Sequence, residues 1–327
     1  MLLCPRGCGA RIRPAGAVIG ADFSVRFEHE RQTLLPAVAL FFGMAFFLPA
    51  QTPVPVAKTE YGPAKGSLVI IGGGSTTGTG IIEKFIELAG GRDAKFIIVP
   101  TALGNRRSDG SVVGYGEEQT IRPWRKLGLK NVKMLHTHDP KIADTEAFVK
   151  DLTEAGAVWF DGGRQWNIVD SYANTRTFRE FHKVLKRGGV IGGSSAGATI
   201  QGQYLVRGDT SGPGVMMTAE ANHQLAFGFL RRSAIDQHVN TRNRWDDLIP
   251  VIKQHPNLLG IGLSEGTAII VQGDSFAVMG RGKVAIHDNS RRYEPPEKPY
   301  WVLEAGDSFD MKLRKATKAH RGGVPTR

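Results

Sequence analysis

The stretch GGVIGGSSAGATIQG, residues 188–202, predicts a buried strand that ends in glycines and two serines and then passes into a helix of small residues. Its inner part, Gly193 to Gly197, fits the pattern G-x-S-x-G, in which a serine stands at a sharp turn between strand and helix with its hydroxyl exposed. Flanking glycines leave room for such a strained turn. The pattern predicts that Ser195, rather than its neighbour Ser194, is a nucleophile. A glycine-rich turn that only packs is the alternative.

Strands and helices alternate along the chain from residue 66 onward. Buried strands are expected within residues 66–75, 94–102, 130–138, 156–165 and 189–193, and helices within residues 80–91, 144–155 and 178–188 and after Ser195. This order is typical of an α/β protein with a doubly wound, mostly parallel sheet and helices on both faces. Sites in such sheets form beyond the carboxyl ends of the strands, so the glycine-rich segments IGGGST, FDGGRQ and IGGSSAGA are expected to meet there.

The composition is that of an ordinary globular protein, with 41% apolar and 22% charged residues in a chain of 327. The net charge of +11 is unevenly distributed, because residues 59–310 hold 30 basic and 28 acidic side chains. A basic groove is therefore not supported, and we predict no nucleic-acid partner. Three parts are expected: a leader over residues 1–58, a catalytic body over residues 59–310 and a solvated basic tail over residues 311–327.

The leader contains an uncharged apolar run, LLPAVALFFGMAFFLPA, at residues 34–50, preceded by Arg31 and followed by small residues and a proline-rich linker. This arrangement predicts a signal peptide and an exported protein, periplasmic or extracellular; an uncleaved membrane anchor is the alternative. Cys4 and Cys8 both lie upstream of the run. The mature body would therefore contain neither a disulfide nor a cysteine ligand for zinc.

Two further patterns do not predict a cofactor. The segment GGGSTTGTG, residues 72–80, has Thr77 where the dinucleotide fingerprint needs its third glycine, and it lacks the Lys-Ser/Thr of a phosphate loop. It is interpreted as a turn that shapes the pocket. His136 and His138 alternate on a predicted strand and share a face, but no third ligand stands nearby, so we expect no metal there.

A serine nucleophile needs a base, an acid that orients the base, and an oxyanion hole. His238, in AIDQHVNTRNRW, is the candidate base. Glu265 lies where a buried strand ends and is the candidate acid, with Asp209 as the competitor. The amides of Gly163 and Ala196 are the candidate oxyanion donors, because they lie at the ends of two adjacent strands.

Four segments in this order and spacing, FDGGRQ, GGSSAGA, DQHVNTRNR and GIGLSEGTAIIV, resemble the cyanophycinase and dipeptidase E family of serine peptidases over roughly residues 66–310. The resemblance implies a fold like that of class I glutamine amidotransferases, a homodimer, and a site without metal. An enzyme of the amidotransferase type itself would carry cysteine where this chain has Ser195.

The resemblance also implies roles for individual residues. It assigns the nucleophile to Ser195, the base to His238 and the acid to Glu265, and it makes substrate-binding residues of Gln165, Asp236, Gln237, Arg242 and Arg244. Gln165 and Asp236 would receive a substrate guanidinium or ammonium. The family's third arginine is absent, because Asp246 and Asp247 stand there. That departure would weaken the grip on a further carboxylate of a polymer.

The resulting hypothesis is a serine peptidase that hydrolyses aspartyl peptide bonds through an acyl-enzyme. A cyanophycinase-like activity that releases β-Asp-Arg dipeptides is placed first. The alternatives are an Asp-X dipeptidase and a non-catalytic protein that binds a small ligand on the same fold.

Overall fold

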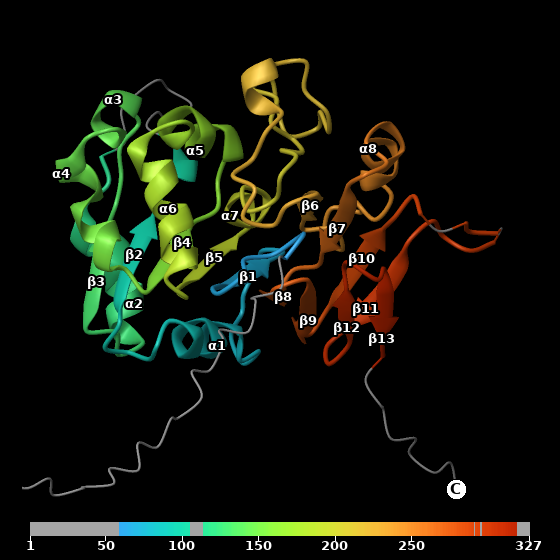
Figure 1. Ribbon diagram of the computed structural model, residues 1–327, viewed down its shortest axis with the longest axis horizontal. Helices are drawn as coiled ribbons and strands as arrows, with labels where there is room; N and C mark the ends of the chain where they lie inside the picture. Colours follow the sequence, from blue (N-terminus) through green and yellow to red (C-terminus); the bar gives the residue numbers. More distant parts are fainter. Residues whose placement is uncertain (1–58, 105–113, 291, 295, 319–327) are drawn as a thin grey trace, which may run out of the picture. The chain divides into compact units, whose positions relative to one another are not determined.

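A nine-stranded mixed sheet forms the centre of the protein (Figure 1). The structure is a computed structural model that describes residues 59–104, 114–290, 292–294 and 296–318, so the predicted leader lies outside the described residues. Five strands are parallel: β1 (Ser67–Ile71), β2 (Lys95–Val99), β3 (Asn131–Met134), β4 (Ala157–Phe160) and β5 (Val190–Ser194). Four are antiparallel: β8 (Thr267–Gln272), β9 (Ser275–Gly280), β12 (Ser308–Asp310) and β13 (Lys315–Thr317). Their order is β13-β12-β9-β8-β1-β5-β4-β2-β3.

The register brings the carboxyl ends of the central strands level. Ile71 of β1 lies opposite Ser194 of β5, and Phe160 of β4 lies opposite Gly193. The residues that follow these three strands therefore meet at one edge of the sheet, as the sequence predicted.

Helices cover both faces of this sheet, because the buried strands present apolar side chains on each side. One face packs on α1 (Ile81–Leu88) and α2 (Glu117–Lys126). The other packs on α3 (Pro140–Ala143), α4 (Glu146–Val149), α5 (Gln165–Tyr172), α6 (Arg176–Lys186) and α7 (Ala196–Thr199). Short 3₁₀ turns are η1 (Thr101–Leu103), η2 (Lys150–Glu154) and η3 (Ala221–His223). The predicted α/β class with helices on both faces is confirmed.

Helix α6 illustrates why these segments are helical. The Thr175 side chain caps its start by accepting a hydrogen bond from the Phe178 N–H at 3.3 Å. Phe181, Val184 and Leu185 recur at helical spacing and are buried against the sheet. The segment 144–155, predicted as one helix, is instead α4 followed by the 3₁₀ turn η2.

A second, four-stranded sheet stands beside the first. It consists of β6 (Ser233–Gln237), β7 (Leu259–Leu263), β10 (Lys283–His287) and β11 (Trp301–Glu304) in the order β11-β10-β7-β6, with α8 (Leu248–Gln254) against β7. Backbone hydrogen bonds join the ends of β6 and β7 to the end of β1: the His238 N–H donates to Gly72 O, and the Gly266 N–H to Gly73 O, both at 2.8 Å. The carboxyl ends of β6 and β7 in the second sheet therefore lie next to the carboxyl end of β1 in the first.

The folded domain continues past residue 310, where the sequence predicted a solvated tail. Met311 is fully buried, and β13 pairs with β12 through Phe309 and Ala316 at the edge of the large sheet. Three of the basic side chains that suggested a tail lie near carboxylates: Lys312 is 3.5 Å from Glu60, Arg314 is 3.3 Å from Asp288, and Lys318 is 3.1 Å from Asp307. In the part of the chain that the structure describes, no helix is long and apolar enough to span a membrane.

Candidate active site

Ser195 stands at a strained turn between β5 and α7. Its backbone has φ 59° and ψ −117°, and its N–H donates to Ile71 O at 3.1 Å. The flanking glycines are sterically required, because a Cβ on Gly193 would lie 2.3 Å from Gly197 O, and one on Gly197 would lie 2.0 Å from Phe160 O. The turn therefore has the form that the G-x-S-x-G pattern predicts.

A continuous row of hydrogen bonds links Ser195 to a histidine and a carboxylate. His238, directly after β6, has its Nε2 2.9 Å from Ser195 Oγ and its Nδ1 2.6 Å from Glu265 Oε1. Glu265 follows the end of β7. The structure thus brings together three residues that are separated by 43 and 27 positions in the chain.

Two residues that the sequence analysis did not single out hold the carboxylate in place. The Thr241 hydroxyl donates to Glu265 Oε1 at 3.0 Å, and the Glu265 N–H donates to Asn240 Oδ1 at 2.9 Å. The hydrogen bond from His238 is the main reason that the pKa of Glu265 is lowered. Both supporting residues lie in the quoted segment DQHVNTRNR, where an amide and a hydroxyl two and three positions after the histidine were the available signal.

Asp209, the competing candidate acid, lies elsewhere. Its carboxylate accepts hydrogen bonds from the Ser211 N–H at 3.0 Å and from the Thr218 hydroxyl at 2.8 Å, within its own loop. Among the described residues it makes no hydrogen bond to His238. The geometry favours Glu265.

His238 is poised as a neutral imidazole. Burial lowers its pKa, the hydrogen bond to Glu265 opposes this shift, and the positive charges of Arg242 and Arg244 lower the pKa further. A neutral ring whose Nδ1–H is held by a carboxylate presents its Nε2 lone pair to Ser195 Oγ. The arrangement can therefore accept the hydroxyl proton.

The glycines after β1 make room for this histidine and its carboxylate. A Cβ on Gly73 would lie 2.1 Å from His238 Cε1, and one on Gly74 would lie 2.7 Å from Glu265 Oε2. Both glycines also have positive φ, 107° and 67°, which other residues rarely adopt. The segment GGGSTTGTG thus shapes the site in a specific way: its missing side chains make the space in which His238 and Glu265 lie.

The two predicted oxyanion donors flank Ser195. Ala196 is the first residue of α7, and Gly163 follows β4, next to Gly162, whose Cβ position would lie 3.2 Å from Ser195 Cβ. Gly163 has φ 146°, and a Cβ there would lie 2.2 Å from Ala102 O. Neither amide donates to a protein acceptor within the described residues, so both are available to a substrate oxygen.

Asp236 does not take the role that the resemblance implied. Its side chain is fully buried, and the Arg207 guanidinium grips both of its oxygens, Nε to Oδ1 and Nη2 to Oδ2, each at 2.9 Å. Arg207 is itself buried and also donates to Asp247. Burying a charged aspartate without such a partner would cost several kcal/mol, and here the Arg207 guanidinium compensates the charge of Asp236. It cannot receive a substrate cation.

Gln165 and Gln237 are both buried, and the Gln165 side chain makes internal hydrogen bonds. Gln165 is buried, and its amide nitrogen donates to Val206 O at 2.9 Å and to Arg207 O at 2.8 Å. The Gln237 carbonyl accepts a 3.5 Å hydrogen bond from Arg244. Its side-chain Oε1 is buried and has no partner among the described residues.

The two predicted arginines differ in how far they are available. Arg244 is largely buried, with its guanidinium 3.9 Å from Asp236. Arg242 is exposed, and no ion pair to it is found in the described part of the chain. Asp246 and Asp247, expected to repel a substrate carboxylate, are paired with Lys298 and Arg207. Within the described residues, Arg242 therefore has a guanidinium without an ion-pair partner, four positions after His238.

His136 and His138 lie further along the sheet edge. Their Nδ1 atoms lie 3.0 Å from the Thr101 hydroxyl and 3.2 Å from the Ser171 hydroxyl, and their rings pack edge to face. Burial lowers the pKa of His136 to about 4. Where residues are described, no group of three potential metal ligands is found.

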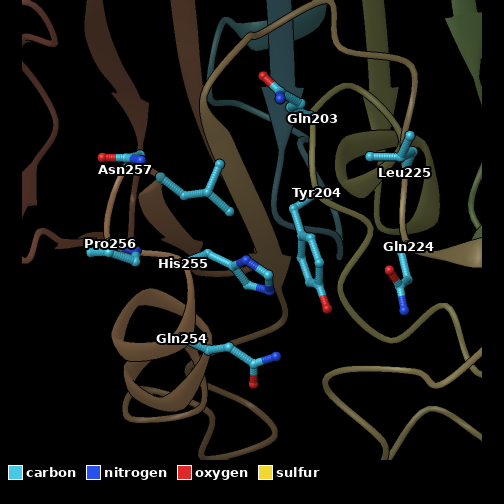
Figure 2. Close-up of a pocket in the computed structure, with 9 residues that line it drawn as sticks. Gln203, Tyr204, Gln224, Leu225, Gln254, His255, Pro256 and Asn257 are labelled. Atoms are coloured by element: carbon cyan, nitrogen blue, oxygen red, sulfur yellow. The ribbon is translucent and has the colours of Figure 1, made fainter. Parts of the chain in front are cut away.

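A hollow of about 400 Å³ lies at the other end of β6 (Figure 2). Tyr204 bridges to Ala234 near the start of this strand, whereas His238 follows its end. The hollow is lined by Gln203, Tyr204, Gln224, Leu225, Gln254, His255, Pro256, Asn257 and Leu258. Ser195, His238 and Glu265 do not line this hollow, so it is separate from the candidate active site.

A serine, a histidine and a carboxylate in hydrogen-bonded order, on a doubly wound sheet and beside two free amides, define a serine hydrolase. The model of peptidase family S51 matches residues 68–279, and the chain belongs to this family of serine peptidases.

Similar proteins support this assignment. The chain is similar to a cyanophycinase of Geminocystis herdmanii, 28% identical over 228 residues that cover 68% of this chain and 81% of the relative. It is also similar to a cyanophycinase of Synechococcus elongatus, 29% identical over 242 residues that cover 72% of each chain. The solved structure of a peptidase from an acI-B1 Actinobacterium has a TM-score of 0.56 and 23% identity, covering 75% of this chain and 97% of its own, and so shares the fold.

Proposed function

We propose that this peptidase hydrolyses aspartyl peptide bonds through an acyl-enzyme, with Ser195 as the nucleophile, His238 as the general base and Glu265 as the orienting acid. One observation carries the catalytic part of the proposal: the hydrogen bonds that run from Glu265 through His238 to Ser195 Oγ. A protein that only bound a ligand would not need these three groups in this order.

The reaction follows from the positions of the groups. His238 Nε2 accepts the proton of Ser195 as Oγ attacks the carbonyl carbon, and the amides of Gly163 and Ala196 stabilise the oxyanion. The protonated His238 then gives its proton to the leaving amine, which departs as the acyl-enzyme forms. Water, activated by His238, hydrolyses the ester and restores Ser195.

The substrate is proposed to carry carboxylates. Arg242 is exposed and has no ion-pair partner in the part of the chain that the structure describes, and guanidinium groups bind carboxylates through paired hydrogen bonds. The similarity to cyanophycinases supports cyanophycin, with release of β-Asp-Arg, as the first candidate.

Small Asp-X peptides are the second candidate, favoured by one specific observation. Arg207 neutralises Asp236 completely, so this carboxylate is not available to the guanidinium of a β-Asp-Arg unit. A substrate without a cationic side group needs no such partner.

The two candidates are separated by incubating the purified protein with cyanophycin, with β-Asp-Arg and with α-Asp-X dipeptides, and by identifying products by mass. Release of β-Asp-Arg from the polymer supports the first candidate, and cleavage of the α-dipeptides alone supports the second. Inertness toward all three contradicts the aspartyl proposal. Failure of a fluorophosphonate to label the serine would favour a binding protein instead.

We also propose that the protein is exported, because the apolar run at residues 34–50 has the length and flanks of a signal sequence. Sequencing the N-terminus of the native protein should find a start between about residues 50 and 60. Finding Met1, with the activity in the soluble cytoplasmic fraction, would contradict export.

A further inference from the structure

Whereas Arg242 lies in the segment after β6, Arg164 lies in the segment after β4, which also supplies the candidate oxyanion residue Gly163. It directly follows Gly163, and its own N–H donates to Ala102 O at 2.6 Å, which fixes the backbone at this point. Its side chain is exposed, and the guanidinium carbon lies 5.5 Å from the centroid of the Trp166 ring. The ring restrains the guanidinium without neutralising its charge.

No acidic side chain pairs with Arg164 within the described residues. The first turn of α5, which Arg164 precedes, contains no acidic residue. Asp161 accepts a hydrogen bond from the Trp159 indole at 2.9 Å, and Asp170 pairs with His223 at 2.7 Å. Among the described residues, Arg164 is therefore a restrained guanidinium without an acidic partner, of the kind that suits a carboxylate.

The chemistry decides which part of a substrate reaches each arginine. The leaving amine must lie against His238 Nε2, because that atom supplies its proton. Arg242 lies on the same segment as His238, because its backbone N–H donates to the His238 backbone carbonyl at 3.0 Å. Gly163 and Arg164 follow β4, on the other side of Ser195, where the acyl residue extends.

We propose that Arg164 is a specificity-determining residue that binds a carboxylate carried by the acyl residue, while Arg242 faces the leaving group. The site then selects peptides that carry a carboxylate on each side of the scissile bond. This inference rests on the proposed aspartyl peptidase function and names its substrate class.

The test uses two pairs of substrates that differ in one carboxylate. Aspartyl and asparaginyl p-nitroanilides differ only on the acyl side, whereas Asp-Leu and Asp-Leu amide differ only on the leaving side. Arg164→Gln should lower the ratio of kcat/KM for the first pair about tenfold, mainly through KM of the aspartyl substrate, and leave the second ratio unchanged. Arg242→Gln should do the reverse.

Two further variants make the result specific. Trp166→Leu removes the ring beneath the guanidinium and should lower the acyl-side ratio in the same direction but by less. Arg122→Gln removes an exposed arginine of α2 and should change neither ratio. Thermal unfolding of each variant verifies that the fold is intact.

The outcomes for this inference and for the proposed function are distinguishable. An unchanged ratio in Arg164→Gln, or an equal loss on both p-nitroanilides, overturns the role of Arg164 while leaving the peptidase intact. A wild-type enzyme that does not prefer the aspartyl to the asparaginyl substrate overturns both proposals.

Discussion

Asp236 and His238 are two positions apart at the end of β6, yet they serve two networks of opposite kind. His238 joins Ser195 to Glu265, whose side chain is 33% exposed, at the surface where a substrate can reach. Asp236 has no exposed surface and joins Arg207 in a buried ion pair. The segment that resembles a known active site therefore contains both catalytic chemistry and the internal cluster that supports it. Substitutions in the two networks should have different effects, on turnover in one case and on stability in the other.

The largest effect is expected for Ser195→Ala, which removes the nucleophile. Hydrolysis should fall by a factor on the order of a thousand or more, with the melting temperature nearly unchanged. Steady-state kinetics and thermal unfolding measure the two quantities. Ser194→Ala is the matched control and should only weaken activity. Equal activity in Ser195→Ala and wild type contradicts the mechanism.

Arg207→Met should act on stability instead. Removing Arg207 takes both 2.9 Å hydrogen bonds from the buried Asp236 and leaves it only Arg244, at 3.9 Å, so the loss should be about 3–5 kcal/mol of unfolding free energy. Arg232→Met is the control, because the pair between Arg232 and Glu60 is exposed and contributes at most about 1 kcal/mol. Denaturant unfolding measures both. Similar losses in the two variants would contradict a structural role for the buried cluster.

Glu265→Gln should lower kcat by about a hundredfold or more, because an amide no longer holds the His238 ring in its catalytic orientation and charge balance. Asp209→Asn should change kcat little, since Asp209 is bonded within its own loop. The comparison of the two rates identifies the acid. A larger loss in Asp209→Asn would overturn the assignment of Glu265.

Gly73→Ala should impair catalysis although it changes none of the three catalytic residues. The new Cβ would lie 2.1 Å from His238 Cε1, so the ring must move, and kcat should fall by about one to two orders of magnitude. Gly78→Ala is the control: it also has positive φ, 73°, but nothing lies within 4 Å of its Cβ position. Both variants share the backbone strain, so a selective loss of kcat in Gly73→Ala isolates the steric effect. Equal kcat values in Gly73→Ala and Gly78→Ala would show that the His238 ring tolerates the added methyl group.

The smallest effect concerns pH. Burial and the nearby arginines lower the pKa of His238, so the acid limb of kcat/KM should lie below 6.5 in the wild type. Arg242→Gln removes a positive charge that disfavours the imidazolium, so the pKa should rise and activity at acid pH should fall. The pH profile on aspartyl p-nitroanilide, which has no leaving-group carboxylate, measures this shift. A limb that moves to lower pH would contradict the stated cause.

The five parallel strands and their alternation with helices could be predicted because apolar runs and glycine-rich ends are local features of the sequence. Ser195 was identified for the same reason, since the G-x-S-x-G pattern lies within five consecutive residues. His238 and Glu265 needed the resemblance to a family as well, because nothing local distinguishes them from other histidines and carboxylates. The end of the domain was misjudged, because basic residues at a sheet edge resemble a tail until Met311 is seen to be buried.

By itself, the sequence determined the doubly wound sheet, the nucleophile turn and a body with nearly balanced charge, because each depends on residue type and short-range spacing. Tertiary structure decided what the remaining groups do. Arg207 lies 29 positions from Asp236, yet it neutralises that carboxylate and withdraws it from the substrate. Gly73 makes room for a ring 165 positions away in the chain. Charge pairing and steric exclusion act through space over a few ångströms, so only the fold that brings distant residues to one edge of the sheet could assign these roles.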